Sequence, residues 1–375
     1  MKFTPIYSYK SKDYAHHKIR LRGVKQNLKI AMPIKAQRFR LLFTNLYNSH
    51  RLRIKKVEII INGNYYPITL NGKTKFSIKP FKEVYSDEIE IDEEDVVAIL
   101  ISVKFAFFNR AYTVSDFNSI KIHAVDHMDM FNSPKNIGLA TKSISKPNLQ
   151  LVALIKQVEA ITELKSITWF GDSLTNHGHY TQPLQVRMHQ DNKALTILNA
   201  GHSGNRLLRD GRHLMKNEFG ISGLKRIQHD VFDFNQPDAV VVALGINDLI
   251  HPGSTVPQDE LPTFEAMQAG YLDLLKQIKG HHAKAIICTI TPFEGYKVST
   301  LAAAEKIRQA LNAWIRTQSD FDLVLDIDEV VKDPNNPKQL DSPYIGDDYL
   351  HWDALGGQML ADQIDLQSIY TLLDL

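Results

Sequence analysis

Hydrophobic periodicity changes near residue 164, and the change divides this chain of 375 residues into two patterns. After residue 164, short apolar strands alternate with longer stretches of helical period. The strands fall at residues 166–170, 195–199, 239–244, 284–290 and 323–327, and the helices around residues 261–279, 301–317 and 354–373. Such alternation, with strands that are apolar throughout, is typical of a parallel sheet covered by helices on both faces. The second half is therefore predicted to be an α/β domain.

Short strands divided by turn signals fill the first half. The strand-like segments are residues 18–23, 38–44, 53–61 and 96–103, and the turn sequences include Asn62-Gly63-Asn64 and Asn71-Gly72. Several short strands without a long helical period indicate an all-β domain of the sandwich or jelly-roll type. Because the chain is too long for one ordinary core, we expect two domains, with the β-sandwich at residues 1–160 and the α/β domain at residues 161–375.

Charge is distributed unevenly between the two halves. Residues 1–150 carry 25 Lys and Arg against 13 Asp and Glu, whereas the other 225 residues carry 19 against 29. A basic surface for an anionic partner, such as a charged glycan or nucleic acid, is one interpretation. The other is a basic domain that faces an acidic one. We favour the second and expect no nucleic-acid partner, because the basic residues alternate with apolar ones along strands, as on solvated faces.

The composition and the first residues of the sequence indicate the cellular compartment. The content of 43% hydrophobic and 23% charged residues is that of a soluble globular protein. The N-terminus lacks the apolar region of a signal peptide and no stretch reaches transmembrane length, so we expect a cytoplasmic protein without membrane insertion. The one cysteine, Cys288, lies in an apolar run, which indicates a buried and inert thiol.

A serine directly after the first apolar strand of the second half is a candidate nucleophile. Ser173 stands in Gly171-Asp172-Ser173-Leu174, at the sheet edge where α/β folds bind their ligands. A serine hydroxyl needs a base to remove its proton, and His351 is the candidate. Asp348 precedes His351 by three residues, so on a helical turn its carboxylate reaches the ring and fixes the tautomer. Asp347 lacks this spacing.

Hydrolysis through a tetrahedral intermediate also requires hydrogen-bond donors for the oxyanion. Asn247 follows the strand at 239–244 and offers a side-chain NH2 group. The segment 199–205 follows another strand, and its Gly201 or Gly204 permits a backbone N–H to approach the substrate. The Ser173 amide is a third donor. Each motif alone is short, but their joint occurrence in this order, at element ends, favours a catalytic site.

At these motifs the chain resembles the SGNH hydrolases, also called GDSL esterases or lipases. The resemblance rests on four blocks: Gly171-Asp172-Ser173-Leu174-Thr175, residues 199–205, Gly245-Ile246-Asn247-Asp248 and Asp348-Tyr349-Leu350-His351. Residues 38–45, 205–211 and 326–334 are similar to a two-domain bacterial branch in which an all-β domain precedes the catalytic one. The resemblance therefore covers most of the chain.

The resemblance implies a role for each matching residue. Ser173 would be the nucleophile, His351 the base and Asp348 its orienting carboxylate. Gly204 rather than Gly201 would share the oxyanion hole with Asn247 and the Ser173 amide. The implied fold is a flavodoxin-like three-layer sandwich, and the implied reaction is ester hydrolysis through an acyl-enzyme. No cofactor or metal is expected.

Two positions depart from the family pattern. The family usually has proline and then asparagine after the histidine, but this chain has Trp352 and Asp353. Trp352 is therefore a candidate wall of the substrate pocket. His202 stands where an aliphatic residue is commoner. His177, His179 and His202 lack the carboxylate–histidine spacing of a metal motif, so we expect them to line the cleft or face solvent.

The substrate class follows from weaker signals. No long amphipathic lid segment is visible, which argues against a lipase that acts at oil interfaces. A β-sandwich beside an esterase suggests saccharide recognition by analogy of fold, so removal of short acyl groups such as acetyl from a carbohydrate or small alcohol is predicted. A lysophospholipase or thioesterase of the same mechanism is one alternative. A glycan-binding protein with an inactive hydrolase domain is the other.

Overall fold

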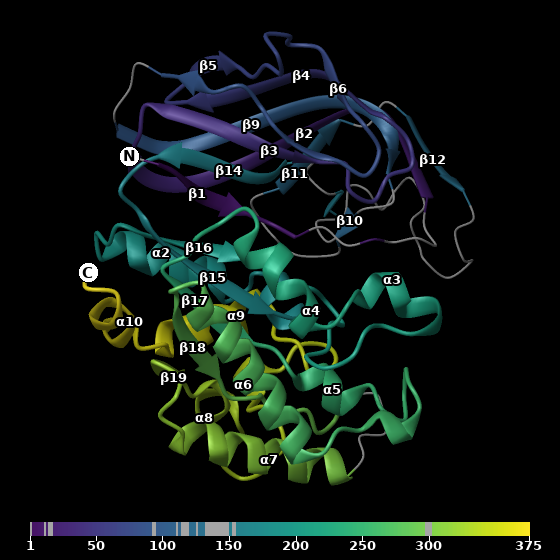
Figure 1. Ribbon diagram of the computed structural model, residues 1–375, viewed down its shortest axis with the longest axis vertical. Coiled ribbons are helices and arrows are strands. Elements are labelled where there is room, and N and C mark those ends of the chain that lie inside the picture. The colour runs from purple at the N-terminus through teal and green to yellow at the C-terminus, as the bar shows by residue number, and fades with distance from the viewer. Residues whose placement is uncertain are drawn as a thin grey trace. The chain divides into compact units, whose positions relative to one another are not determined.

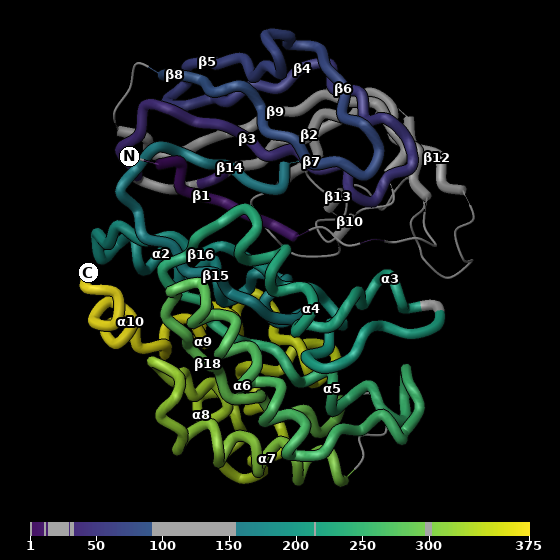
Figure 2. Tube along the Cα trace, in the orientation of Figure 1, coloured from purple at the N-terminus to yellow at the C-terminus, as the bar shows by residue number. Residues whose placement is uncertain are grey.

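A computed structural model of the chain describes residues 2–10, 13, 18–91, 95–109, 112–113, 120–124, 127–131, 150–151, 155–296 and 302–375 (Figure 1). Figure 2 follows the course of the chain in the same orientation. The chain falls into two compact units, Met1–Leu164 and Lys165–Leu375. None of the helices within the described ranges is both long enough and apolar enough to cross a membrane.

The first unit is built mainly from antiparallel strands (Figure 1). One sheet has the order β1 (Phe3–Ser8), β14 (Ile155–Ile161), β3 (Arg38–Thr44) and β7 (Glu83–Tyr85), with β8 (Ile89–Glu90) also paired to β3. A second has the order β11 (Ile120–Ala124), β2 (Lys18–Lys35), β9 (Asp95–Asn109), β4 (Leu52–Ile61) and β5 (Asn64–Pro67). In this sheet β12 (His127–Phe131) pairs with β2, and β6 (Phe76–Ile78) pairs with β4. A separate pair joins β10 (Tyr112–Thr113) to β13 (Gln150–Leu151).

A shared hydrophobic core joins the two larger sheets of the first unit. Phe39, Leu41 and Phe43 of β3 belong to the same buried cluster as Ile54 and Ile59 of β4. Apolar side chains alternate with exposed ones in the first part of both strands, as expected when one face of a sheet is buried. Two antiparallel sheets with their inner faces in one core form a β-sandwich. The all-β prediction for the first half is confirmed.

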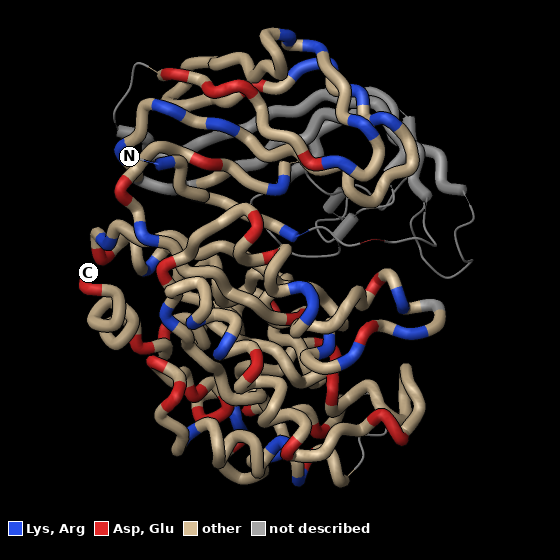
Figure 3. Tube along the Cα trace, viewed as in Figure 1, with Lys and Arg blue, Asp and Glu red and all other residues tan. Residues whose placement is uncertain are grey.

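Part of the positive charge of the first unit is neutralised within it. Arg40 of β3 pairs with Glu159 at 2.6 Å on the neighbouring strand β14. Lys156 pairs with Glu83 at 3.0 Å. Basic positions are spread over several strands and loops of this unit (Figure 3). The Glu159 and Glu83 side chains are only 2% and 9% exposed, so these pairs balance positive charge inside the unit rather than on a solvated strand face.

The second unit contains a parallel sheet of five strands. Its order is β16 (Leu195–Asn199), β15 (Lys165–Gly171), β17 (Ala239–Ala243), β18 (Lys284–Cys288) and β19 (Leu323–Leu325). Numbered along the unit, this is the order 2-1-3-4-5 of flavodoxin-like folds, which bind ligands at the carboxyl edge where the order reverses. The prediction of an α/β domain with a parallel sheet is confirmed.

Alternate residues of each strand pack on opposite faces of this sheet. Val240 and Val242 of β17 lie in one core, which includes apolar residues of α6 (Phe264–Gly280) and α7 (Ala302–Thr317). Val241 lies in the other, with residues of α2 (Thr181–Gln190), α9 (Ala354–Gln363) and α10 (Leu366–Leu372). Shorter helices complete the unit: α1 (Ser173–Asn176), α3 (Lys216–Phe219), α4 (Gly223–Ile227), α5 (Ile246–Ile250) and α8 (Ile327–Val331).

Several boundaries expected from the sequence are wrong: the strand expected at residues 284–290 ends at Cys288, and two further boundaries have a local cause. The last helix, expected at residues 354–373, is two helices, because Asp365 breaks the run and caps α10 by accepting hydrogen bonds from the N–H groups of Gln367 and Ser368. The last strand ends at Leu325 rather than at residue 327. Asp326 accepts a hydrogen bond from the Glu329 N–H and so begins α8 there. In both cases a capping carboxylate interrupts an apolar run.

Candidate active site

Ser173 lies at a sharp transition from strand to helix. Strand β15 ends at Gly171, and α1 begins at Ser173. Asp172 caps the helix, with its carboxylate accepting a hydrogen bond from the Leu174 N–H at 3.1 Å. Burial raises the pKa of Asp172 to about 7, against opposing effects of the Leu174 N–H and of nearby positive charge. The transition presents the serine at the carboxyl end of the sheet.

A continuous line of hydrogen bonds joins Ser173 to two residues near the C-terminus. The Ser173 Oγ lies 2.7 Å from the His351 Nε2. The opposite ring nitrogen, Nδ1, lies 2.7 Å from the Asp348 Oδ2. The structure therefore brings together the three residues that the sequence predicts to act as nucleophile, base and orienting carboxylate.

The turn from Asp348 to His351 differs from the helical turn expected. It is an irregular turn in which Tyr349 takes a left-handed φ of +61°. Asp348 Oδ1 accepts hydrogen bonds from the backbone N–H groups of Leu350 at 3.1 Å and His351 at 2.9 Å. The aspartate thus folds its own turn, and its other oxygen remains for the imidazole. The spacing of three residues therefore brings the carboxylate to the imidazole through this irregular turn and not through a helical turn.

Electrostatics fixes the tautomer of the imidazole. Partial burial tends to raise the pKa of Asp348, but hydrogen bonds from the His351 ring and backbone hold it well below the usual range. An ionised Asp348 accepts a hydrogen bond from the Nδ1–H group, which leaves the lone pair of Nε2 directed at Ser173. This is the protonation state that a general base requires.

Asn247 lies at the first turn of α5, beyond the carboxyl end of β17. Its side chain is buried, and its Nδ2 donates a hydrogen bond to the Asn205 carbonyl at 3.0 Å. An amide nitrogen carries two hydrogens, so one remains to be donated to a substrate. The contact also ties Asn247 to the loop after β16, which carries the other predicted donor.

Gly204 and Gly201 occupy different environments in that loop. Gly204 has a φ of +76°, and a side chain there would overlap the Phe219 ring. A side chain at Gly201 would overlap the backbone of Asn176 in α1. Gly201 therefore allows the loop to pack against α1, whereas Gly204 forms the turn. Among the described residues, neither the Gly204 N–H nor the Ser173 N–H has a hydrogen-bond acceptor.

Asp248 supports the same loop and was given no role by the sequence. Its carboxylate accepts hydrogen bonds from the backbone N–H groups of Leu207 at 2.6 Å and Leu208 at 3.0 Å. Burial raises its pKa to about 6, although these N–H groups and Arg206 oppose the shift. The sequence does indicate a buried role for Asp248, because it directly follows Asn247 in a segment that is otherwise apolar.

The three histidines near the site have distinct surroundings. The His177 ring lies 5.0 Å from the His351 ring, centroid to centroid. His179 Nδ1 lies 2.8 Å from the Trp352 carbonyl. His202 is buried, with its Nε2 2.8 Å from the Glu218 carbonyl. Within the described part of the chain, no three His, Cys, Asp or Glu residues are grouped so that they could hold a metal ion.

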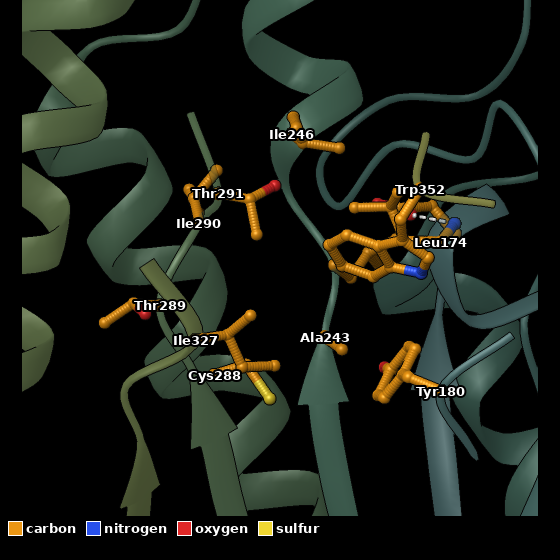
Figure 4. A pocket seen from close by; sticks show the side chains of 12 residues that line it. Leu174, Tyr180, Ala243, Ile246, Cys288, Thr289, Ile290, Thr291, Ile327 and Trp352 are labelled. Carbon is orange, nitrogen blue, oxygen red and sulfur yellow. Dashed lines mark hydrogen bonds between the residues drawn. The ribbon is translucent and has the colours of Figure 1, made fainter. Parts of the chain in front are cut away.

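A pocket lies beside the nucleophile and the base. Leu174 and Trp352, which follow Ser173 and His351 in sequence, line one side of it with Tyr180. Cys288 and other residues line the opposite side (Figure 4). The pocket encloses about 370 Å³, its open mouth included. Trp352, predicted to wall a substrate pocket, is buried in its lining and packs edge-on against Tyr180.

Comparison with known proteins identifies the family. The model of the GDSL-like lipase/acylhydrolase family matches residues 169–359, which is more than half of the chain and includes all of the residues proposed for the site. The chain belongs to this family, whose members hydrolyse carboxylic esters. No curated protein matches the chain.

Several solved structures are similar to the chain. The acetyl xylan esterase AlAXEase has 19% identity and a TM-score of 0.40, over 55% of this chain and 98% of that chain. A putative acylhydrolase from Bacteroides fragilis NCTC 9343 has 20% identity and a TM-score of 0.40, over 56% and 88%. A carbohydrate esterase family 2 enzyme plus carbohydrate binding domain from Corynascus thermopiles (Myceliophthora fergusii) has 14% identity and a TM-score of 0.41, over 100% and 99%.

Proposed function

We propose that the second unit is a serine esterase that hydrolyses carboxylic esters through an acyl-enzyme on Ser173. The observation that carries the proposal is the line of contacts from Asp348 through His351 to Ser173, with both ring nitrogens 2.7 Å from their partners. Such a line converts a serine hydroxyl into a nucleophile. Membership of an acylhydrolase family supports the same reaction class.

Acylation begins with proton transfer to the imidazole. His351 Nε2 accepts the Ser173 proton as Oγ attacks the ester carbonyl carbon, and the carbonyl π electrons move to the oxygen. Asp348 stabilises the imidazolium that forms, without itself taking the proton. When the intermediate collapses, the bond to the alkoxide breaks, and the imidazolium donates its proton to the leaving alcohol.

Deacylation repeats these steps with water. His351 accepts a proton from the water that attacks the acyl carbon, and then returns it to Ser173 Oγ as the acid leaves. In both halves the oxyanion accepts hydrogen bonds from the Ser173 N–H, the Gly204 N–H and the Asn247 side chain. Donors that are already oriented stabilise the transition state without reorganisation.

The pocket beside the site supports a short acyl group as the substrate. Its lining is mainly apolar, and the large side chains of Trp352 and Tyr180 form one wall (Figure 4). Large side chains in a pocket wall overlap with longer acyl chains and so favour a short acyl group. We propose acetyl as the acyl group. A saccharide as the alcohol rests on the β-sandwich unit, by analogy of fold.

Substitution of the nucleophile tests the reaction. Ser173→Ala should abolish hydrolysis of 4-nitrophenyl acetate. The thermal midpoint should stay near that of wild type because, among the described residues, the Ser173 hydroxyl has a hydrogen bond only with the His351 ring. Ser86→Ala is the control for turnover, since Ser86 and Ser173 are both 7% exposed and Ser86 lies in the first unit. It should leave turnover unchanged, although its thermal midpoint should fall because the Ser86 hydroxyl bonds the Leu41 N–H and the Asp87 carbonyl. Undiminished turnover by Ser173→Ala would dismiss the assignment.

A substrate series tests the acyl and alcohol halves. Specificity, measured as kcat/KM, should fall from acetyl to octanoyl esters, and acetylated sugars should be hydrolysed faster than a lysophospholipid or an acyl thioester. Trp352→Phe should shift the preference toward longer acyl groups, because it enlarges the pocket. Trp314→Phe, outside the pocket lining, should not. A preference for long chains in the wild type would favour the lysophospholipase or thioesterase alternative.

A further inference from the structure

An arginine that the sequence did not single out is buried beneath the candidate active site. Arg226 lies in α4, and only 1% of its surface is exposed. A guanidinium stays charged even when buried, so it requires a full set of acceptors. The identities and positions of those acceptors indicate what the residue does.

Two of the acceptors are carbonyls at the carboxyl ends of neighbouring strands. Arg226 Nη2 donates a hydrogen bond to the Gly171 carbonyl at 2.7 Å, two residues before Ser173. Nη1 donates to the Ala200 carbonyl at 2.9 Å, directly after β16. One planar group therefore joins the strand that carries the nucleophile to the strand that precedes the oxyanion loop.

The third acceptor lies within the loop itself. Arg226 Nε donates to the side-chain oxygen of Asn205 at 2.7 Å. Asn205 follows Gly204, and its carbonyl accepts the hydrogen bond from Asn247. The guanidinium is thus connected, through one residue, to both of the predicted donors that lie outside α1.

The charge of Arg226 is balanced away from the site. Asp230 accepts a hydrogen bond from Nη1 at 3.0 Å, one helical turn later. The guanidinium also stacks on the Phe170 ring at 3.9 Å. Because Asp230 balances its charge, Arg226 does not require an anionic substrate. Its other N–H groups bond the carbonyls of Gly171 and Ala200 and the side chain of Asn205.

We propose that Arg226 is a positioning residue, which sets the distance between Ser173 and the oxyanion donors Gly204 and Asn247. This inference rests on the proposed esterase function. A displacement of about 1 Å between reacting groups costs on the order of a hundredfold in rate. Loss of the guanidinium hydrogen bonds should therefore lower kcat more than it weakens substrate binding.

Arg226→Lys is the test variant, because it keeps the buried charge that Asp230 balances but cannot reach all of these acceptors. With 4-nitrophenyl acetate, kcat should fall by about tenfold or more, and KM should stay within about threefold. In an Asn247→Ala background, the loss of kcat caused by Arg226→Lys should be several-fold smaller, because one of the donors that Arg226 positions is already absent.

Arg308→Lys is the matched control. Arg308 is also buried, and it bonds two carboxylates, Asp328 and Glu305, and two backbone carbonyls, those of Ile290 and Pro337. None of these acceptors belongs to Ser173 or to the loop after β16. Its effect on kcat should be the same with and without Asn247→Ala.

Hydrogen–deuterium exchange gives a readout that does not require turnover. Exchange of the peptide that spans residues 200–208 should accelerate in Arg226→Lys and stay at the wild-type rate in Arg308→Lys. Unchanged exchange, a kcat within twofold of wild type, or equal losses in both Asn247 backgrounds would overturn the proposal. A wild-type protein without esterase activity would instead refute the proposed function. The exchange rate of residues 200–208 would still show whether Arg226 holds the loop in place.

Discussion

The Phe219 ring occupies the space that a side chain at Gly204 would need. Phe219 ends α3 and stacks on the buried His251 ring at a centroid distance of 4.7 Å, so it has little freedom to move away. Gly204 also has a left-handed φ of +76°, which disfavours any residue with a Cβ. Glycine is therefore required at this point of the oxyanion loop for two independent reasons.

Gly204→Ala should displace the loop. We expect kcat to fall by about a hundredfold and the unfolding free energy to fall by about 2 kcal/mol, because overlap adds to backbone strain. Gly72→Ala is the control: Gly72 has a φ of +71°, but no atom of the described residues lies within 4 Å of a Cβ there. It should cost only about 1 kcal/mol and leave kcat unchanged. Equal effects of the two substitutions would contradict the account.

Asn247→Ala should remove one donor of the oxyanion hole. Because the interaction strengthens only in the transition state, kcat should fall by about a hundredfold or more with little change in KM. Asn45→Ala tests for a general effect of losing a buried amide, since the Asn45 side chain donates to three backbone carbonyls in the first unit. It should lower stability and leave kcat alone. A kcat of Asn247→Ala within twofold of wild type would remove this residue from the hole.

Asp348→Asn should favour the wrong tautomer of His351. An amide can donate to Nδ1 and so place the ring proton on Nε2, which blocks transfer from Ser173; kcat should fall by about three to four orders of magnitude. Because the pKa of Asp348 is depressed in the folded state, its contribution to stability is present above about pH 4 and is lost as the pH falls. The variant should therefore lose less stability on acidification than wild type, as measured by urea unfolding.

Asp172→Asn should alter how stability depends on pH. Burial raises the pKa of Asp172 to about 7, so between about pH 4 and pH 7 the folded state binds a proton that the unfolded state has released. Wild type therefore loses stability as the pH rises through this window, and the variant, which does not titrate, is spared that loss. The difference should reach a few kcal/mol. Fluorescence of the three tryptophans, all in the second unit, follows the unfolding. A difference that is constant from pH 4.5 to 7.5 would contradict the assignment.

Much of the second unit could be predicted from the sequence because its signals are local. Strands of apolar residues such as 195–199 mark a parallel sheet, and parallel strands bring their carboxyl ends to one edge. Ser173 and Asn247 follow two such strands, so their proximity to the same edge was predictable. The chemical roles of these residues, like the cytoplasmic location, stay predictions.

Other features depend on tertiary contacts that no short pattern encodes. Arg226 follows Lys225 and has the sequence of an exposed basic pair, yet its side chain is buried against strand ends far along the chain. Asp365 interrupts an apolar helical run, and only its capping geometry shows that the helix stops there. The sequence alone does not show whether such a residue is exposed or buried, because a carboxylate or guanidinium can be satisfied by water or by buried hydrogen-bond partners.

Labelling with a fluorophosphonate tests most directly whether the imidazole activates the serine. The probe reacts with a hydroxyl only when a base removes its proton and donors receive the phosphonyl oxygen. We predict one adduct, located by mass spectrometry on Ser173, that forms at least a hundredfold more slowly in His351→Gln. Labelling at another residue, or an equal rate in wild type and His351→Gln, would contradict the account.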